Sequence, residues 1–281
     1  MNYITPGTFR ATLLLAAMAG LFIAIGSLFG VLGMASALAL AIVIGFWSFW
    51  HSGPAIVAAS GARELTLTTD RRVLDTVSRL SAAAGVPMPH VFEIDDPHPN
   101  AFAVGANPKQ ASLILTKGLR KALSKDQLAA IIGHELAHIR SRDTLAATIG
   151  AVFLEAIIGL AMILALVGII AHKHGGCFLI ILSIFFPVIA LVLHLAASRS
   201  REYEADRYGA ELTGGPQAMI AALKSLSKRP TSTQVAIAAP ATAALWFVDP
   251  LVGAWLSHLL STHPPIERRI ARLERVTARK S

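Results

Sequence analysis

Two histidines and a glutamate interrupt an otherwise apolar stretch, "IIGHELAHIR", near the middle of the chain. His134 and His138 are four residues apart, so on a helix both imidazoles project from one face, as two zinc ligands require. Glu135 is turned by about 100° from His134, where its carboxylate can take a proton from a water without ligating the metal. The pattern predicts a zinc site with Glu135 as general base. The competing interpretation is a pair of ordinary, hydrogen-bonded helix histidines.

A catalytic zinc needs a third protein ligand and one open coordination position. The extended pattern with a third histidine soon after His138 is absent, so the ligand must come from elsewhere in the chain. The segment "SRSREYEADRYGAEL" carries Glu202 and Asp206 at i and i+4, on one helical face. We expect Glu202 to bind zinc and Asp206 to orient a ligand histidine through its other ring nitrogen. Spacing alone leaves Glu204 open as the alternative ligand.

The composition is that of a membrane protein with a modest polar part. The 281 residues are 54% hydrophobic and 15% charged, against roughly 25% charged residues in soluble domains. The formal charge of +8 includes no Lys/Arg run with interleaved aromatics, so it indicates a membrane surface and no nucleic-acid partner. The single cysteine, Cys177, excludes an internal disulfide and a thiolate zinc cluster.

Four apolar runs predict four transmembrane helices. They cover residues 11–32, 35–58, 144–171 and 177–197. Each approaches or exceeds the roughly 20 residues that cross a bilayer. The first two runs are expected to form a hairpin that turns near Gly33 and Met34. Arginines gather beside the polar segments, whereas the hairpin tips carry one lysine or none, so the polar segments and both termini are placed in the cytoplasm.

The polar residues predict one α+β domain that the second hairpin divides in sequence. The expected parts are an N-terminal hairpin (1–59), a first domain part with the histidine motif (60–143), a second hairpin (144–198) and a second domain part with the third ligand (199–281). "PHVFEI" and "SLILT" predict short strands. Ser124 followed by Gln127 predicts the start of the helix that carries the motif. As an exposed strand edge, "NAFAVG" would pair with an extended peptide through backbone hydrogen bonds; an ordinary strand entry is the alternative.

Two further features have no assigned role. Glu155 lies inside the third apolar run, where a carboxylate is a functional candidate unless that part of the helix reaches the interface. Residues 233–256 are apolar enough for a fifth crossing, but Pro240, Asp249 and Pro250 interrupt them. We interpret this segment as lying on the membrane or covering the substrate.

Four motifs, "GHELAHIRSRD", "SRSREYEAD", "NAFAVG" and "THPPIERRI", together resemble the HtpX family of membrane zinc metalloproteases, relatives of the CAAX prenyl proteases. The resemblance covers nearly the whole chain. It implies a mainly α, integral membrane protein with four transmembrane helices and a cytoplasmic α+β zincin-like domain with a small β-sheet. It also implies one Zn²⁺ per chain, with Glu202 rather than Glu204 as the third ligand.

The same resemblance suggests residues that hold the substrate near the zinc. These residues are Asn100, Ala101, Phe102, Ala103, His263 and Arg269. The first four form the strand edge, and the last two, in the H-P-P-x-x-x-R pattern, would help to hold substrate or the oxyanion.

The leading hypothesis is therefore a membrane-integral zinc endopeptidase. The resemblance implies cleavage of misfolded or damaged membrane proteins on the cytoplasmic side of a bacterial inner membrane, with the lipid bilayer as the other partner. A prenyl-protein processing peptidase is the first alternative, disfavoured because four spans are too few for a large enclosed chamber. A zinc-stabilised scaffold is the second, disfavoured because Glu135 is present and a closed structural site more often has four protein ligands. The oligomeric state is left open.

Overall fold

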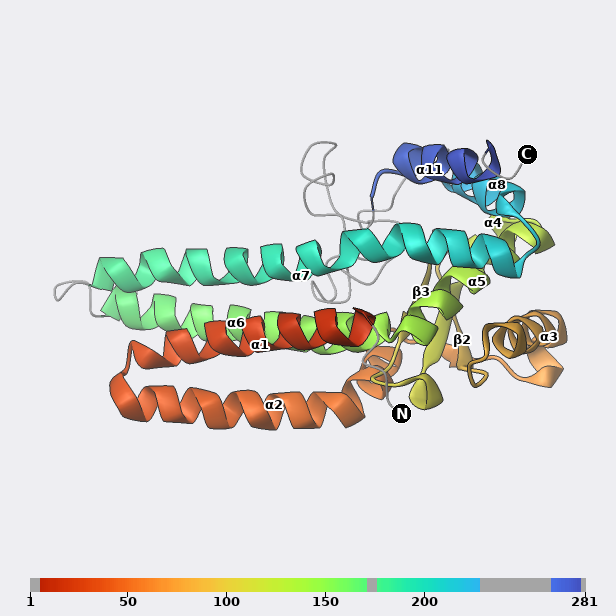
Figure 1. Ribbon diagram of the computed structural model, residues 1–281. Coiled ribbons are helices and arrows are strands. Elements are labelled where there is room, and N and C mark those ends of the chain that lie inside the picture. The colour runs from red at the N-terminus through yellow and green to blue at the C-terminus, as the bar shows by residue number, and fades with distance from the viewer. Residues whose placement is uncertain (1–5, 171–175, 228–263, 279–281) are drawn as a thin grey trace.

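The computed structural model describes residues 6–170, 176–227 and 264–278. A bundle of long helices lies beside a smaller part that contains a sheet and shorter helices (Figure 1). The long helices are α1 (Pro6–Ser27), α2 (Gly30–Ala59), α6 (Asp143–Ile170) and α7 (Gly176–Leu212). Helices α6 and α7 continue from the bundle to the edge of the sheet-containing part, so both parts share the same rigid elements.

The bundle has the apolar exterior of a membrane-spanning structure. Within the described ranges, three segments are long and apolar enough to cross a bilayer: Gly30–Ala59, Asp143–Ile170 and Gly176–Leu193. The apolar part of α1, Thr12–Ser27, is shorter, but its side chains share a buried core with α6 and α7. Large apolar side chains such as Leu32 cover the outside of the bundle, which favours hydrocarbon over water. The chain is an integral membrane protein.

The first hairpin turns earlier than the sequence suggested. The turn lies at Leu28 and Phe29, and α2 begins at Gly30 with a φ of 76°, a conformation that glycine accommodates. The expected turn residue Gly33 is instead inside α2, where a Cβ would overlap the backbone of Gly26 on α1. The expectation at Gly33 and Met34 was wrong because that glycine serves the close approach of two helices.

The sheet is small and mixed. Its strands are β1 (Arg63–Glu64), β2 (His90–Ile94), β3 (Ala101–Val104) and β4 (Ser112–Thr116), in the order β1-β2-β4-β3 for the described residues. Strands β2 and β4 are parallel, and β3 pairs with β4 in antiparallel fashion, Ala101 opposite Leu115. The segments "PHVFEI" and "SLILT" form β2 and β4 as expected, and "NAFAVG" provides the edge strand.

Both faces of the sheet are covered. One face packs on α3 (Leu67–Ala84) and α5 (Lys125–Ser141), with Ala101, Ala103 and Leu113 in the shared core. On the other face, Phe102 packs with Ile56 and Val57, near the end of α2. All four side chains of β3 are therefore buried, because α2 runs past its membrane segment and covers the second face. The strand is terminal in the sheet order of the described residues, so the pairing of its outer edge with an extended peptide stays a prediction.

Candidate metal centre

Helix α5 holds the two histidines in a rigid setting. It begins with the expected capping box, in which Ser124 N donates to Gln127 Oε1 at 2.9 Å and Gln127 N donates back to Ser124 Oγ at 3.3 Å. The opposite side of the helix is anchored by fully buried apolar side chains, among them Ile132 and Leu136. This packing fixes the direction in which the motif residues project.

A pair of glycines lets α7 approach this helix closely. A Cβ on Gly133 would lie 3.1 Å from Gly209 Cα, and a Cβ on Gly209 would lie 2.7 Å from His134 N. A Cβ at Gly209 would push α5 and α7 apart, since real Cβ atoms do not approach backbone so closely, and a Cβ at Gly133 would need a shift of a few tenths of an ångström. The short separation brings Glu202, on α7, within reach of both histidines.

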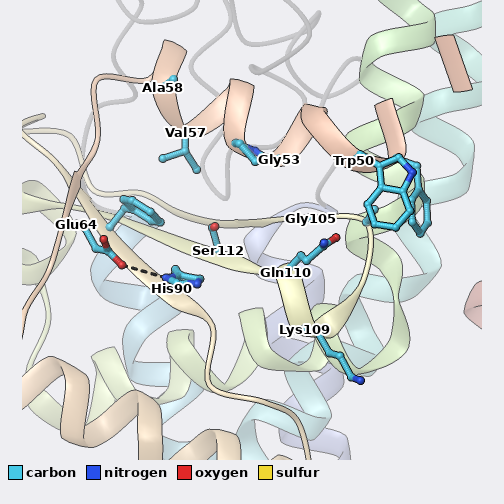
Figure 2. A pocket seen from close by; sticks show the side chains of 14 residues that line it. Trp50, Gly53, Val57, Ala58, Glu64, His90, Gly105, Lys109, Gln110 and Ser112 are labelled. Atoms are coloured by element: carbon cyan, nitrogen blue, oxygen red, sulfur yellow. Dashed lines mark hydrogen bonds and ion pairs between the residues drawn. The ribbon is translucent and has the colours of Figure 1, made fainter. Parts of the chain in front are cut away.

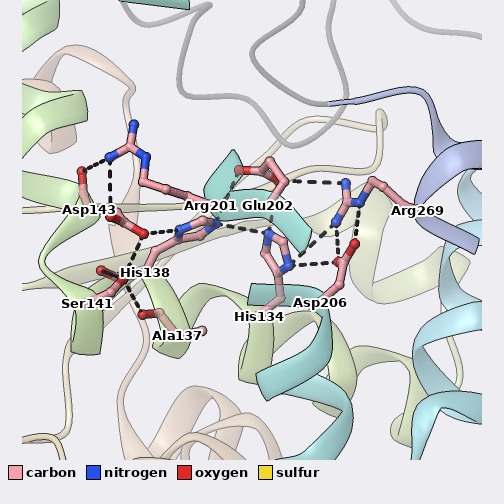
Figure 3. Close-up of polar contacts among 9 residues, drawn as sticks. All are labelled: His134, Ala137, His138, Ser141, Asp143, Arg201, Glu202, Asp206 and Arg269. Carbon is pink, nitrogen blue, oxygen red and sulfur yellow. Dashed lines mark hydrogen bonds and ion pairs between the residues drawn. The ribbon is translucent and has the colours of Figure 1, made fainter. Parts of the chain in front are cut away.

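Three donor groups from these two helices converge (Figure 3). His134 Nε2 lies 3.1 Å from His138 Nε2. The Glu202 carboxylate completes the triangle, with Oε1 3.4 Å from His138 Nε2 and Oε2 3.5 Å from His134 Nε2. Tetrahedral ligands about 2.0–2.1 Å from a zinc ion would be about 3.3–3.4 Å apart. The donor set and its spacing therefore fit a zinc ion, and Glu204 is exposed on another face of α7.

Asp206 lies one turn after Glu202 and holds the other side of His134. Its Oδ1 is 3.0 Å from His134 Nδ1. Arg269, on α11 (Ile266–Ala278), donates from Nε to Asp206 Oδ2 at 2.8 Å and from Nη2 to Oδ1 at 2.6 Å. Burial raises the pKa of the Asp206 carboxyl, but the Arg269 guanidinium outweighs it and lowers the pKa to about 2. The carboxylate is thus ionised when it fixes the imidazole.

Arg269 lies in the metal centre, but its side chain faces carboxylates. It is 1% exposed, and its Nη1 lies 3.9 Å from Glu202 Oε2. The sequence suggested contact with substrate or the oxyanion. Its position instead favours compensation of the charge on Glu202 and Asp206.

A second carboxylate, which the sequence analysis did not single out, holds His138. Asp143 Oδ2 is 3.2 Å from His138 Nδ1 and accepts a hydrogen bond from Ser141 Oγ at 2.7 Å. Arg201 Nη1 donates to Asp143 Oδ1 and to its carbonyl oxygen, both at 3.3 Å. Each proposed ligand histidine therefore has a carboxylate at its other ring nitrogen, an arrangement that fixes the ring orientation in metal sites.

The position of Asp143 depends on an unusual backbone turn. Arg142 ends α5 with a φ of 61°, the only positive value among the described non-glycine residues. This turn places Asp143, the first residue of α6, back beside His138. One sequence signal could have indicated Asp143: it and Arg201 have opposite charges and lie at the ends of two apolar runs that a hairpin brings together.

The centre concentrates buried charge. Among the described residues it contains four carboxylates and two guanidinium groups, each at most 7% exposed: Glu135, Asp143, Glu202, Asp206, Arg201 and Arg269. With neutral histidines, two negative charges are left without compensation, and buried uncompensated charge is strongly unfavourable. A divalent cation held by His134, His138 and Glu202 would neutralise them.

The surrounding carboxylates raise the pKa of both histidines. Burial lowers the pKa of His138, but its hydrogen bonds with Asp143 and Glu202 outweigh that effect and raise the pKa to about 10. The pKa of His134 is also raised, with burial opposed by hydrogen bonds to Asp206 and Glu202. Metal binding requires neutral imidazoles and therefore releases protons, so metal affinity falls as the pH falls.

The proposed substrate-binding residues have different settings. Asn100 is 1% exposed and immediately precedes β3. Its backbone N donates a hydrogen bond to Thr116 Oγ1 at 2.8 Å, and its carbonyl oxygen accepts one from Thr116 N at 3.0 Å. Strand β3 contacts α5, so the edge strand lies beside the helix of the metal centre. The side chains of Ala101 and Ala103 pack in the core with α5, whereas Phe102 packs near the end of α2.

Three other expectations concern His263, residues 233–256 and Glu155. His263 and residues 233–256 lie outside the described residues. Glu155 is exposed on α6, 12 residues beyond Asp143, which is about 18 Å along the helix. It is not part of the metal centre.

Comparison with known proteins agrees with this geometry. The family model described as "Peptidase family M48" matches residues 67–277. The chain belongs to peptidase family M48. It is 38% identical over 279 residues to "Protease HtpX homolog" of Syntrophobacter fumaroxidans, covering 94% of this chain and 98% of that protein. A protein of the same description from Desulforapulum autotrophicum is 41% identical over 274 residues, covering 94% and 88% of the two chains.

The fold resembles that of a solved protein structure. The "Crystal Structure of S. mikatae Ste24p" superposes with a TM-score of 0.56 at 18% identity, covering 92% of this chain. The chain spans 62% of the length of that structure. Together, the family membership and the apolar helices make this chain a membrane-bound M48 metalloprotease, and the resemblance to HtpX proteases is confirmed.

Replacing Glu202 by Ala is expected to lower the metal content of the purified M48 protein far more than Glu204→Ala does. Glu202 offers an oxygen to the triangle of donors, whereas Glu204 faces outward from the same helix. Metal analysis of the two variants is the measurement. The reverse order would move the third ligand to Glu204.

Asp143→Asn is expected to weaken metal affinity by about 10–100-fold, the usual effect of losing such a histidine partner. The amide keeps the size of the side chain but removes the charge that faces His138 and Arg201. Asp126→Asn is the matched control, since Asp126 is also in the first turn of a helix but is exposed. Competition against a chelator measures both affinities; equal values would show that Asp143 does not support the ligand.

Proposed function

We propose that this M48 protein is a zinc-dependent endopeptidase, with zinc held by His134, His138 and Glu202 and with Glu135 as the general base. The convergence of three donors on two rigid helices supports this proposal. When bound, zinc supplies a Lewis acid that polarises the scissile carbonyl and lowers the pKa of a water to about 7.

The protein side chains then have separate tasks. Glu135 follows His134 on α5 and is 4% exposed, so its carboxylate is shielded from bulk water. It takes a proton from the attacking water and delivers it to the leaving amine. Asp206 and Asp143 hold the two imidazoles in orientation. Arg269 holds Asp206 and limits the negative charge around Glu202.

We place the substrate along β3. This strand is terminal in the order of the sheet and lies beside α5, the position at which an extended peptide adds to a sheet. Binding there would use main-chain groups of residues 100–103, and so would select a substrate by its ability to become extended. His263 is proposed as a further contact on sequence resemblance alone.

The membrane arrangement sets the substrate class. Glu202 lies 26 residues after the start of α7, and Asp143 lies 27 residues before the end of α6. Both distances, about 40 Å along a helix, exceed the roughly 30 Å of hydrocarbon by about 10 Å. The metal centre is therefore just outside the hydrocarbon, within reach of segments that emerge from the membrane.

We infer that the substrates are misfolded or damaged membrane proteins, cut on the cytoplasmic side of a bacterial inner membrane. In this arrangement α1 crosses the membrane together with α2, α6 and α7, which makes four crossings, and both termini are cytoplasmic. The hairpins are 1–59 and 144–198, and the protease domain combines 60–143 with 199–281. The HtpX homologues support the general role, and the arginines beside the polar segments support the orientation.

Glu135→Gln is expected to keep bound zinc and the fold but to reduce peptide cleavage by about 10²–10⁴-fold, because the amide cannot accept the proton. Turnover of an unstructured peptide and metal content should be measured together. Glu204→Gln is the control that should retain activity. Wild-type turnover in Glu135→Gln would show that another group is the base.

Four crossings place residues 2 and 125 on the cytoplasmic side and residue 29 on the other. Cysteines introduced singly at these positions, in a Cys177→Ala background, are to be probed with a membrane-impermeant maleimide. In spheroplasts only the cysteine at 29 should react; those at 2 and 125 should need membrane disruption. Reaction of 2 but not 125 in spheroplasts would show that α1 does not cross.

The proposed substrate class is tested with one reporter protein prepared folded, destabilised and tethered to the membrane in destabilised form. Unfolding a stable domain costs roughly 5–15 kcal/mol, so the folded form should be cut slowly and the other two at many sites. Zinc-loaded Glu135→Gln protein is the control for contaminating proteases. Efficient cutting of the folded form at one strict sequence, or cutting confined to a prenylated peptide, would favour a dedicated processing peptidase.

A further inference from the structure

A cavity of about 450 Å³ lies away from the metal centre, between the end of α2 and the sheet (Figure 2). Phe92 of β2 and Ser112 of β4 line it, on the face opposite the one that packs on α5, since their neighbours Val91 and Leu113 belong to the α5 core. Its lining in the described part of the chain includes no residue of the metal centre. The cavity is therefore separate from the proposed metal site.

The cavity lies at the level of the lipid headgroups. Trp50, which lines it, comes 20 residues after the start of α2, a distance of about 30 Å that equals the hydrocarbon thickness. Helix α6 places the cavity at the same depth relative to the membrane. Gly105 also lines the cavity and donates its N–H to Thr148 Oγ1 at 3.3 Å, and Thr148 lies about 33 Å along α6 from Ile170.

The tryptophans of α2 agree with this level. Trp47 and Trp50 are 49% and 50% exposed, and tryptophan is enriched where a protein meets the membrane–water interface. They lie near the junction of the apolar helix with the sheet, where the cavity lies. Lipid headgroups are the most abundant molecules at that depth.

The lining combines aromatic rings with charges of both signs. Glu64 is 3.0 Å from His90 Nδ1 at one end of the cavity, and Lys109 belongs to the lining in the loop after β3 (Figure 2). Phe92, the register partner of Glu64 in the sheet, contributes a ring beside the carboxylate, and Trp50 contributes a ring at the opposite end of the cavity (Figure 2). A carboxylate together with aromatic faces attracts an ammonium group, whereas a lysine attracts a phosphate.

We propose that this cavity binds the headgroup of a zwitterionic, amine-bearing phospholipid, with its ammonium at Glu64 and the Phe92 ring and its phosphate towards Lys109, at the end where Trp50 lies. An anionic lipid without an amine would leave the Glu64 carboxylate facing a like charge. The proposal rests on α2 crossing the membrane and does not depend on the protease chemistry.

The test uses the full chain in nanodiscs that contain equal amounts of phosphatidylethanolamine and phosphatidylglycerol. Native mass spectrometry after release counts the lipids that stay bound. Phosphatidylethanolamine should be retained in preference to phosphatidylglycerol. Trp50→Ala should lower its retention by about tenfold, through the loss of the aromatic contact at the end of the cavity opposite Glu64, and Glu64→Gln should abolish the preference for the amine.

Trp47→Ala is the matched control, because Trp47 is on the same helix and equally exposed but does not line the cavity. It should change retention by less than about twofold, as expected for a lost surface contact. Glu64→Gln alters an exposed pair, so it carries the test if Trp50→Ala fails to fold. Equal retention of both lipids by the parent chain, or equal losses in Trp47→Ala and Trp50→Ala, would show annular lipid only and overturn the proposal.

Discussion

The compensation of buried charge is the constraint on which the metal centre depends. Four carboxylates and two guanidinium groups of the described chain lie together in an interior from which water is largely excluded. Such a cluster is stable only when each charge has a partner, since removing one member of a buried pair costs roughly 3–5 kcal/mol. The hydrogen-bonded chain Arg201–Asp143–His138 on one side and Arg269–Asp206–His134 on the other supplies these partners. With both imidazoles neutral, as metal binding requires, two negative charges remain, and they lie where a divalent metal fits.

This constraint makes the membrane helices part of the metal centre. Asp143 is the first residue of α6, and Glu202 is on the extension of α7 beyond the bundle. The closest packing of α7 on α5, at Gly209 and Gly133, fixes the distance between the carboxylate and the histidines. A shift of α7 relative to α5 would therefore change the donor geometry directly. The second hairpin is a structural element of the site as well as a membrane anchor.

The sequence predicts those features of the site that depend on local spacing. His134 and His138 are brought together by the period of one helix, and Asp206 follows Glu202 by the same period. The choice of Glu202 over Glu204 needed the family resemblance, because the rotation of α7 is set by its packing on α5. The opposite charges of Asp143 and Arg201 were the only sequence signal for Asp143, since its position depends on a left-handed conformation at Arg142, which a non-glycine residue seldom adopts. The burial of the β3 side chains on both faces depends on the path of α2 beyond its apolar run, which is set by tertiary packing.

The role of Arg269 shows how distant parts of the chain become interdependent. Its guanidinium is fully enclosed and makes two hydrogen bonds to Asp206, 63 residues earlier in the chain. Asp206 in turn holds His134, which lies on a different helix. Until α11 is in place, Asp206 and Glu202 lack the Arg269 guanidinium that compensates their negative charge. The like charges around the donors then oppose the close packing of α7 on α5. The donor triangle is therefore complete only when the C-terminal helix has docked, which ties the metal affinity of a motif in mid-chain to the folding of the last helix.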